Sequence, residues 1–298
     1  MSHIHFVGGE KGGVGKSLMS QLLCQWFIDQ ALPFAALDAD ASHGALLRGY
    51  GDWCHAVDLS VFESADCIMD RALSKERHVV VDLPAQSFRP LTRWLKASNV
   101  VAFASEMAVD LVYWHVTDGG VDSMTTLATA LPELATSVKV VVVRNHRWLK
   151  DFSHLETARP FQDVRERGGT FIELPLIEPQ LLSKAVARGA SLRTIFDPTK
   201  RNQAGLTVME QRRITHFRAL VDQQLGPILQ GPAPSAQPEA SVQPVASVQA
   251  DATPPSLTSK AVPESSKHPL PVGTKWMDGA ATWTEVSETG LVHHVRYR

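Results

Sequence analysis

The chain has 298 residues, 44% of them hydrophobic and 20% charged, which suits a soluble globular protein with a full core. Its formal net charge of −2 excludes a global basic field for binding nucleic acid and leaves only local patches. Cys24, Cys54 and Cys67 lack metal or redox spacing, no secretory signal pattern is present, and no apolar run reaches transmembrane length. We therefore expect reduced cysteines and a cytoplasmic setting.

Short apolar runs with strand character alternate with segments of helical periodicity along residues 1–230. The strand-like runs are Ile4–Val7, Phe34–Leu37, His78–Val81, Val100–Ala104, Val138–Val143 and Thr170–Leu174. Helical patterns cover 18–30, 64–74, 87–97, 121–131, 152–167, 179–188 and 207–229. Continuous runs of branched apolar residues are typical of strands buried on both faces. The alternation predicts an α/β fold with a doubly wound, mostly parallel sheet.

The first expected strand runs directly into a glycine-rich loop at residues 8–17, in which Gly15-Lys16-Ser17 match the end of the pattern G-x-x-x-x-G-K-[ST]. Glycines let backbone N–H groups turn toward phosphate oxygens. The second lysine of the loop would reach the β- and γ-phosphates, and the serine hydroxyl would bind Mg²⁺. The helix that follows would point its positive end at the phosphates. The predicted nucleotide-binding residues are Gly12, Gly13, Val14, Gly15, Lys16, Ser17 and Leu18.

Carboxylates follow two of the expected strands. Asp38-Ala39-Asp40 comes after the second strand, and Asp82 ends the run Val79-Val80-Val81 in the manner of a Walker B strand. Ligands of open α/β sheets bind at the carboxyl ends of the strands, so we expect Asp82 to coordinate Mg²⁺ directly or through water. Helix or turn capping is the common alternative for Asp38 and Asp40.

The composition changes after residue 230. Residues 231–273 hold nine of the eighteen prolines and no aromatic residue, which predicts a disordered linker. In the last segment, 274–298, Trp276-Met277-Asp278-Gly279 suggests a tight turn, and strands are expected at Thr282–Val286 and Leu291–Tyr297. A small β-meander, a partner-docking peptide and an unstructured terminus remain open for this segment, because so small a sheet is marginal alone.

The loop has an additional lysine, Lys11, in the motif Lys-Gly-Gly-Val-Gly-Lys-Ser, which resembles the deviant Walker A loop of the ParA/MinD family of dimerising ATPases. The resemblance covers about residues 1–230 and implies a SIMIBI-type NTPase fold. It also implies ATP and Mg²⁺ as ligands, with catalytic roles for Lys11, Lys16 and Asp40. In this family the early lysine reaches the phosphates of the partner subunit.

Three further positions match the family pattern. The resemblance assigns to Asp40 the orientation of the attacking water near Mg²⁺, so that Ser17, Asp40 and Asp82 form the metal site. It assigns contacts with the adenine base to Asn145 and to the turn at Pro175. The chain departs from the family at Glu10 and at Ala41-Ser42-His43, where Pro-Gln is usual. A carboxylate at position 10 would repel phosphate unless it points away or pairs with a lysine.

The resemblance implies an ATP-dependent homodimer with a protein adaptor or cargo, acting in DNA partition, plasmid transfer or cargo positioning. Basic residues near the last helical pattern would give a patch for nonspecific DNA binding, although a solvated helix face is the more common meaning of such charges. They are Lys200, Arg201, Arg212, Arg213, His216 and Arg218. The chain lacks a lysine-rich amphipathic end, which argues against membrane binding. An ATP-gated scaffold with little turnover and an ATP-dependent biosynthetic enzyme remain alternatives.

Overall fold

A computed structural model describes residues 2–40, 44–74 and 78–230, together with three strands at 275–277, 283–286 and 292–295. The chain divides into two compact units, Met1–Gln237 and Pro238–Arg298, and each is described by itself. The predicted linker at 231–273 lies outside the described residues, as do the three residues that follow Asp40.

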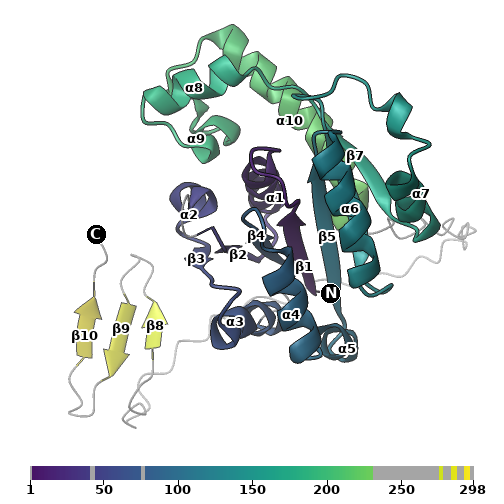
Figure 1. Ribbon diagram of the computed structural model, residues 1–298. Coiled ribbons are helices and arrows are strands. Elements are labelled where there is room, and N and C mark those ends of the chain that lie inside the picture. The colour runs from purple at the N-terminus through teal and green to yellow at the C-terminus, as the bar shows by residue number, and fades with distance from the viewer. Residues whose placement is uncertain are drawn as a thin grey trace, which may run out of the picture. The chain divides into compact units, whose positions relative to one another are not determined.

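A sheet of seven parallel strands, in the order β3-β2-β4-β1-β5-β6-β7, forms the centre of the first unit (Figure 1). Its strands are β1 (Ser2–Gly8), β2 (Phe34–Asp38), β3 (Cys54–Ala56), β4 (His78–Asp82), β5 (Val109–Thr117), β6 (Lys139–Asn145) and β7 (Thr170–Leu174). The strand order reverses around β1, which lies between β4 and β5. Crevices beyond the carboxyl ends of strands at such a reversal are the usual ligand sites of this fold class.

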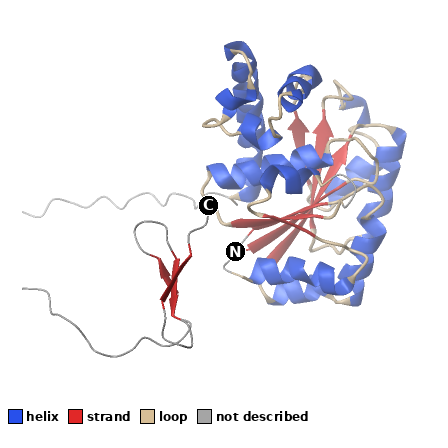
Figure 2. Cartoon of the chain, turned by 90° about the vertical axis from the view of Figure 1, so that its left-hand side faces the viewer, coloured by secondary structure: helices blue, strands red, loops and turns tan. Residues whose placement is uncertain are grey.

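Helices cover both faces of the sheet (Figure 2). One face carries α1 (Lys16–Asp29), α2 (Ala45–Tyr50), α8 (Pro179–Ala187), α9 (Leu192–Phe196) and α10 (Val208–Leu229). The other carries α3 (Phe62–Leu73), α4 (Phe88–Ala97), α5 (Val100–Glu106), α6 (Val121–Glu133) and α7 (Arg159–Glu166). Successive residues of a strand point to opposite faces, so Val80 packs in one cluster while Val79 and Val81 pack in the other. Burial of each such valine contributes about 1.5–3 kcal/mol.

The predicted strand at Val100–Ala104 is wrong, because these residues begin helix α5. Val100 and Ala104, four residues apart, are buried, whereas Phe103 is exposed. This pattern has the period of a helix and not the alternation of a strand. The actual strand is β5, in which Asp110 and His115 interrupt the apolar run that would have marked it in the sequence.

The remaining differences concern short elements. The helical pattern at 152–167 divides into a 3-10 turn, η1 (Ser153–Leu155), and helix α7, which begins next to Pro160. Proline fits the first turn of a helix but not its interior. Helices α2 and α9 and strand β3, together with the 3-10 turn η2 (Arg201–Ala204), were not predicted, since segments of three to six residues carry little periodicity.

The second unit contains three strands, β8 (Lys275–Met277), β9 (Trp283–Val286) and β10 (Val292–Val295). They pair antiparallel in the order β10-β9-β8, with Val292 opposite Val286 and Lys275 opposite Glu285. The turn predicted to begin at Trp276 is wrong in that Trp276 and Met277 belong to β8. The rest of that predicted turn lies outside the described residues.

Candidate functional site

The glycine-rich loop lies between the carboxyl end of β1 and the first turn of α1, as the sequence predicts for a P-loop. Gly15 directly precedes the helix with a φ of +108°, a backbone conformation that side chains rarely adopt. A Cβ atom at Gly15 would also lie 2.7 Å from the Nδ2 atom of Asn145. Both conformation and space therefore require glycine at this position.

Lys16 lies inside the loop and not on its surface. Its side-chain ammonium donates a hydrogen bond to the backbone carbonyl of Lys11 at 2.8 Å, and the residue is buried. Burial lowers the pKa of Lys16, whereas the nearby carboxylates of Asp82, Glu10 and Asp40 raise it. The loop thus holds a lysine ammonium where the P-loop pattern predicts contact with phosphate oxygens.

Asp82, at the end of β4, lies beside the first turns of α1. Its Oδ1 atom accepts a hydrogen bond from the Ser20 hydroxyl at 2.9 Å. Burial raises the pKa of Asp82 to about 7, against the effect of the nearby Ser17 and Ser20 hydroxyls, which lower it. Within the described part of the chain, the buried Oδ2 atom of Asp82 has no hydrogen-bond partner. A divalent cation or its water ligand would satisfy this oxygen, so the residues present fit Mg²⁺.

The two aspartates after β2 have different positions. Asp38 is buried, and its Oδ2 atom accepts hydrogen bonds from the backbone N–H groups of Leu46 and Leu47, both at 2.9 Å. Its Oδ1 atom accepts from the N–H of Asp40 at 3.0 Å. Asp38 therefore caps the start of α2, whereas Asp40 is half-buried and faces the loop.

A cavity of about 460 Å³ lies between the loop and the ends of β2 and β4. It is lined by seven of the predicted positions, namely Gly12, Gly13, Gly15, Lys16, Ser17, Leu18 and Asp40. Five further residues that were not predicted as site residues also line it, namely Ala45, Arg48, Leu83, Pro84 and Ala85. Arg48 is a cation close to the expected phosphates, but it lies on α2, whose six residues carry no clear periodic signal.

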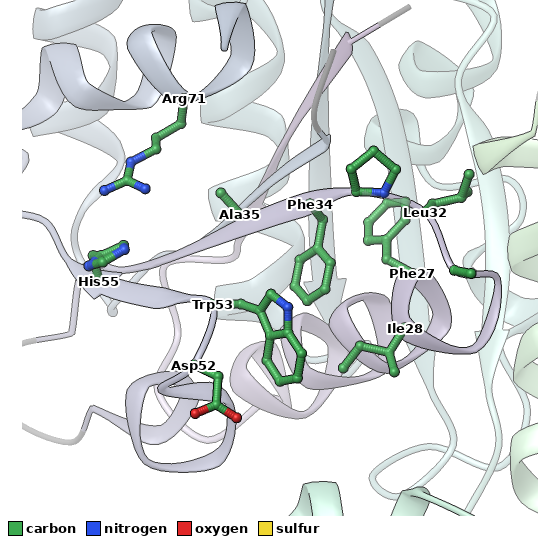
Figure 3. Close-up of a pocket in the computed structure, with 11 residues that line it drawn as sticks. Phe27, Ile28, Leu32, Phe34, Ala35, Asp52, Trp53, His55 and Arg71 are labelled. Atoms are coloured by element: carbon green, nitrogen blue, oxygen red, sulfur yellow. The ribbon is translucent and has the colours of Figure 1, made fainter. Parts of the chain in front are cut away.

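A second cavity, of about 480 Å³, lies at the start of β2, away from the loop (Figure 3). Its wall joins the stacked rings of Phe34 and Trp53, 5.8 Å apart, to the polar side chains of His55 and Arg71. It contains neither the glycine-rich loop nor Asp82. Although its volume is similar, none of the residues predicted to bind phosphate or metal lines it.

Asn145 and Pro175 are not among the residues that line the cavity at the loop. The Asn145 side chain is buried and donates a hydrogen bond from Nδ2 to the carbonyl of Val14 at 2.7 Å. Its Oδ1 atom accepts from the N–H of Arg147 at 3.0 Å. Pro175 lines a separate cavity of about 210 Å³ next to α10. In this structure Asn145 braces the loop, and the adenine contacts assigned to both residues stay predictions.

Lys11 turns toward its own chain. Its ammonium lies 2.7 Å from Asp118 Oδ2 and 4.0 Å from Asp122 Oδ2, and its side chain is 37% exposed. The hydrogen bond with Asp118 raises the pKa of Lys11. The contact of Lys11 with a second subunit stays a prediction.

Glu10, the departure from the family pattern, has a structural partner. Its Oε1 atom accepts a hydrogen bond from the backbone N–H of Phe88 at 2.8 Å, at the first residue of α4. The side chain of Ser87, the residue before this helix, instead donates to the carbonyl of Pro84. A carboxylate is favourable at the positive end of a helix, so Glu10 caps α4 across 78 residues of sequence.

The basic patch expected near α10 is smaller than the sequence suggests. Arg218 is buried and pairs with Asp29 at 2.9 Å and Asp222 at 3.0 Å. Arg201 is buried and donates to the backbone carbonyl of Ile195 at 2.8 Å. Since both guanidinium groups are engaged inside the molecule, the prediction that Arg201 and Arg218 contribute to a surface patch is wrong.

Comparison with known proteins gives relatives in sequence and in structure, although no protein-family model matches. Two proteins named Protein TraL, from Escherichia coli, are each 25% identical to this chain, in alignments of 237 and 238 residues that cover 76% of this chain and 98% of theirs. A nucleotide-binding protein from Archaeoglobus fulgidus, solved with ADP, has a TM-score of 0.37 and 16% identity, over 60% of this chain and 84% of that one. The MinC:MinD cell division protein complex of Aquifex aeolicus has a TM-score of 0.38 and 15% identity, over 72% of this chain and 96% of that one.

None of the helices within residues 2–40, 44–74 and 78–230 combines the length and apolar character needed to traverse a bilayer. The parallel sheet places the glycine-rich loop at its topological switch point, with a carboxylate at the end of the neighbouring strand β4. The two-lysine loop lies between β1 and α1, with Asp40 and Asp82 beside it, which is the strand, loop and helix arrangement that the sequence predicts for a P-loop.

Proposed function

We propose that the chain is a Mg²⁺-dependent ATPase that forms a homodimer when it binds ATP. The observation that carries this proposal is the grouping of Lys16, Ser17 and Asp40 around one cavity at the loop. Asp82 directly precedes the lining residue Leu83, and its buried Oδ2 atom has no hydrogen-bond partner among the described residues. An ammonium, a hydroxyl and carboxylates in this order suit a nucleoside triphosphate with its metal ion.

Each of these residues has a defined task in the proposal. Lys16 and the loop N–H groups hold the β- and γ-phosphates, while Ser17 and Asp82 hold the metal. Bound Mg²⁺ neutralises charge that develops on the phosphates during transfer. Asp40 orients a water for attack, since its half-buried carboxylate lines the same cavity. Asp38 supports this arrangement indirectly, because it binds the N–H of Asp40 and caps α2.

The dimer is proposed to use Lys11. Its partly exposed ammonium exchanges the contact with Asp118 for the phosphates bound by the second subunit. Hydrolysis then removes the γ-phosphate and releases the two subunits. The proposed role is DNA partition, plasmid transfer or positioning of a macromolecular cargo through a protein adaptor. The remaining candidates for nonspecific contact with DNA phosphates are Lys200, just before η2, and the exposed Arg212, Arg213 and His216 on α10.

The experiment compares ATP turnover of the full chain with that of Lys16→Ala, Asp40→Ala and a surface control, Lys150→Ala, with and without Mg²⁺ and DNA. We expect Lys16→Ala to lose nucleotide binding. Asp40→Ala should retain binding but hydrolyse about 100-fold more slowly or worse, the usual effect of removing a catalytic base. Unchanged turnover in Asp40→Ala would refute its role, and absent turnover with ATP-dependent dimerisation would favour the scaffold alternative.

The dimer is tested separately by measuring molecular mass with ATP for the wild type and for Lys11→Ala. The Asp40→Ala background slows hydrolysis and should make the dimer persist. If Lys11→Ala dimerises as tightly as the wild type, contact of Lys11 with the second subunit is wrong, whereas the ATPase proposal is unaffected.

A further inference from the structure

Three histidines meet at the amino-terminal ends of the central strands, away from the loop. His3 and His5 lie on the same face of β1, two residues apart, and His78 begins the neighbouring strand β4. Pairing of Ile4 with Val79 brings His3 and His78 alongside each other. One nitrogen of each histidine lies within 4.8 Å of the other two. His5, the member nearest the loop, lies three positions before Gly8, about 10 Å at the usual rise of a strand, so this cluster is distinct from the glycine-rich loop.

The cluster contains buried nitrogens without partners. His5 is fully buried and His78 is 8% exposed. Among the described residues, neither Nε2 of His5 nor Nδ1 of His78 has a hydrogen-bond partner. An unsatisfied buried polar atom is unfavourable by about 1–3 kcal/mol, so two at one place suggest that something binds between them.

The protonation state of the cluster suits a metal ion. Burial lowers the pKa of His3 and of His5, and it lowers the pKa of His78 to about 4. All three imidazoles are therefore neutral at pH 7, the form that coordinates transition metals. Asp110 Oδ2 lies 3.5 Å from His3 Nε2, and a carboxylate beside the ring is common at histidines that bind metals.

We propose that His3, His5 and His78 bind one divalent transition-metal ion of the Zn²⁺ class, which links β1 to β4 at the base of the sheet. Imidazole nitrogens suit zinc, cobalt, nickel and copper. A cavity of about 440 Å³, lined by His3, His78, Gln30 and Gln230 among others, gives access and room for a water as fourth ligand.

Binding requires a small closure of the three rings. Nitrogens bound at about 2.0–2.1 Å to a tetrahedral ion lie roughly 3.4 Å apart, whereas the described nitrogens lie within 4.8 Å of one another, so each pair must approach by at most about 1.4 Å. The stacking of His78 on Phe27, with ring centroids 4.4 Å apart, holds that ring in place during the closure.

His5 also has a competing contact. The indole N–H of Trp114 donates to His5 Nδ1 at 3.2 Å, which places the ring proton on Nε2. Coordination through Nε2 moves this proton to Nδ1, so the indole N–H must give up its acceptor. Removing that donor should strengthen metal binding, which provides a specific test of His5 as a ligand.

The test measures Zn²⁺ binding by calorimetry and Co²⁺ binding by visible absorption, using full-length protein stripped with EDTA and free of nucleotide. We expect one ion per chain, with affinity at least about 100-fold weaker in His3→Ala and in His78→Phe. His78→Phe retains an aromatic ring against Phe27, and its circular dichroism and melting in EDTA check the fold. His154→Ala, which changes an exposed histidine of η1, should bind like the wild type.

Trp114→Phe should bind Zn²⁺ roughly tenfold more tightly. In the wild type the buried indole N–H loses its acceptor, His5 Nδ1, when the metal binds, and phenylalanine has no such N–H to leave unpaired. Zn²⁺ should raise the melting temperature of the wild type and of His154→Ala, but not that of His78→Phe. Absence of a stoichiometric Zn²⁺ site in the wild type, or equal affinity in His78→Phe, would overturn the proposal. Unchanged affinity in Trp114→Phe would remove His5 from the ligand set.

Discussion

Asn145 shows how one side chain stabilises the loop from a distant strand. Its amide joins Val14 to the end of β6 through a 2.7 Å hydrogen bond, and it packs against Gly15. Because its Nδ2 and Oδ1 atoms are both hydrogen-bonded, the buried Asn145 amide helps to fix the position of the loop, whether or not it also contacts the base. Loop geometry and nucleotide affinity are therefore linked at this residue.

We expect Asn145→Ala to lower the free energy of unfolding by about 1–3 kcal/mol, because the carbonyl of Val14 loses its buried donor. Affinity for ATP and for inorganic tripolyphosphate should fall by similar factors. Chemical denaturation and calorimetry measure both effects, with the exposed Asn202→Ala as control. If tripolyphosphate binding is unchanged while ATP binding weakens, Asn145 contacts adenine and does not brace the loop.

His115 on β5 links stability to pH. It is fully buried with Nε2 3.2 Å from the carbonyl of Ser123, and burial lowers its pKa to about 4. The ordinary histidine pKa is about 6.5, so the folded state favours the neutral form. The stabilisation is present above pH 6.5 and is lost as the pH falls toward 4.

His115→Gln retains a donor for Ser123 but removes the titrating ring. The loss of unfolding free energy between pH 7.5 and pH 4.5 should shrink by roughly 2–3 kcal/mol, since each pKa unit corresponds to about 1.4 kcal/mol. Urea denaturation at both pH values measures this difference. An identical pH dependence in the variant would show that His115 does not titrate with folding.

At the scale of an element, helix α4 depends on a residue from another part of the chain. Glu10 accepts a hydrogen bond from its first residue, Phe88, while the side chain of Ser87 is turned away. Because α4 follows Asp82 and Pro84, this bond connects the glycine-rich loop to the segment after β4. The Glu10 side chain is thereby turned toward α4, which accounts for a carboxylate next to a phosphate site.

Glu10→Ala should destabilise the protein by about 1 kcal/mol, the usual effect of losing a helix cap. Glu10→Gln keeps an acceptor and should lose less. Thermal melts compare these variants with Glu106→Ala at an exposed position, and hydrogen exchange at Phe88 should accelerate only in Glu10→Ala. Unaltered exchange at Phe88 would mean that Glu10 does not cap α4.

At the scale of the whole molecule, both hydrophobic clusters lie between Ile4 and Leu229. We therefore predict that truncation after Gln237 shifts the melting temperature by less than about 2 °C, since both clusters described within residues 2–230 stay intact. Truncation after Lys200 removes Ile214 and Phe217 from one cluster and should abolish cooperative unfolding. A loss of several degrees in the first truncation would place stabilising contacts beyond residue 237.

The nucleotide loop could be predicted from the sequence because its determinants are contiguous. Strand, glycines, Lys16, Ser17 and helix follow one another within 30 residues, and local conformation suffices to bring their groups together. Asp82 could be located because a run of valines ending in an acid marks a buried parallel strand. Strand β5 was not predicted, because Asp110 and His115 interrupt its apolar run. The partners of these polar side chains lie elsewhere in the fold, and the sequence of the strand does not reveal them.

Contacts between distant residues were decided only by the tertiary structure. Glu10 and Phe88, Asn145 and Val14, and His3 and His78 are each separated by more than 70 residues, and parallel pairing with helix packing brings them together. The sequence by itself determined that a phosphate-binding loop exists and which strand ends accompany it. The three-dimensional packing decided that Asn145 braces that loop, that Glu10 caps α4, and that three imidazoles face one another at the other end of the strands. These contacts depend on strand order and register, which no local pattern encodes.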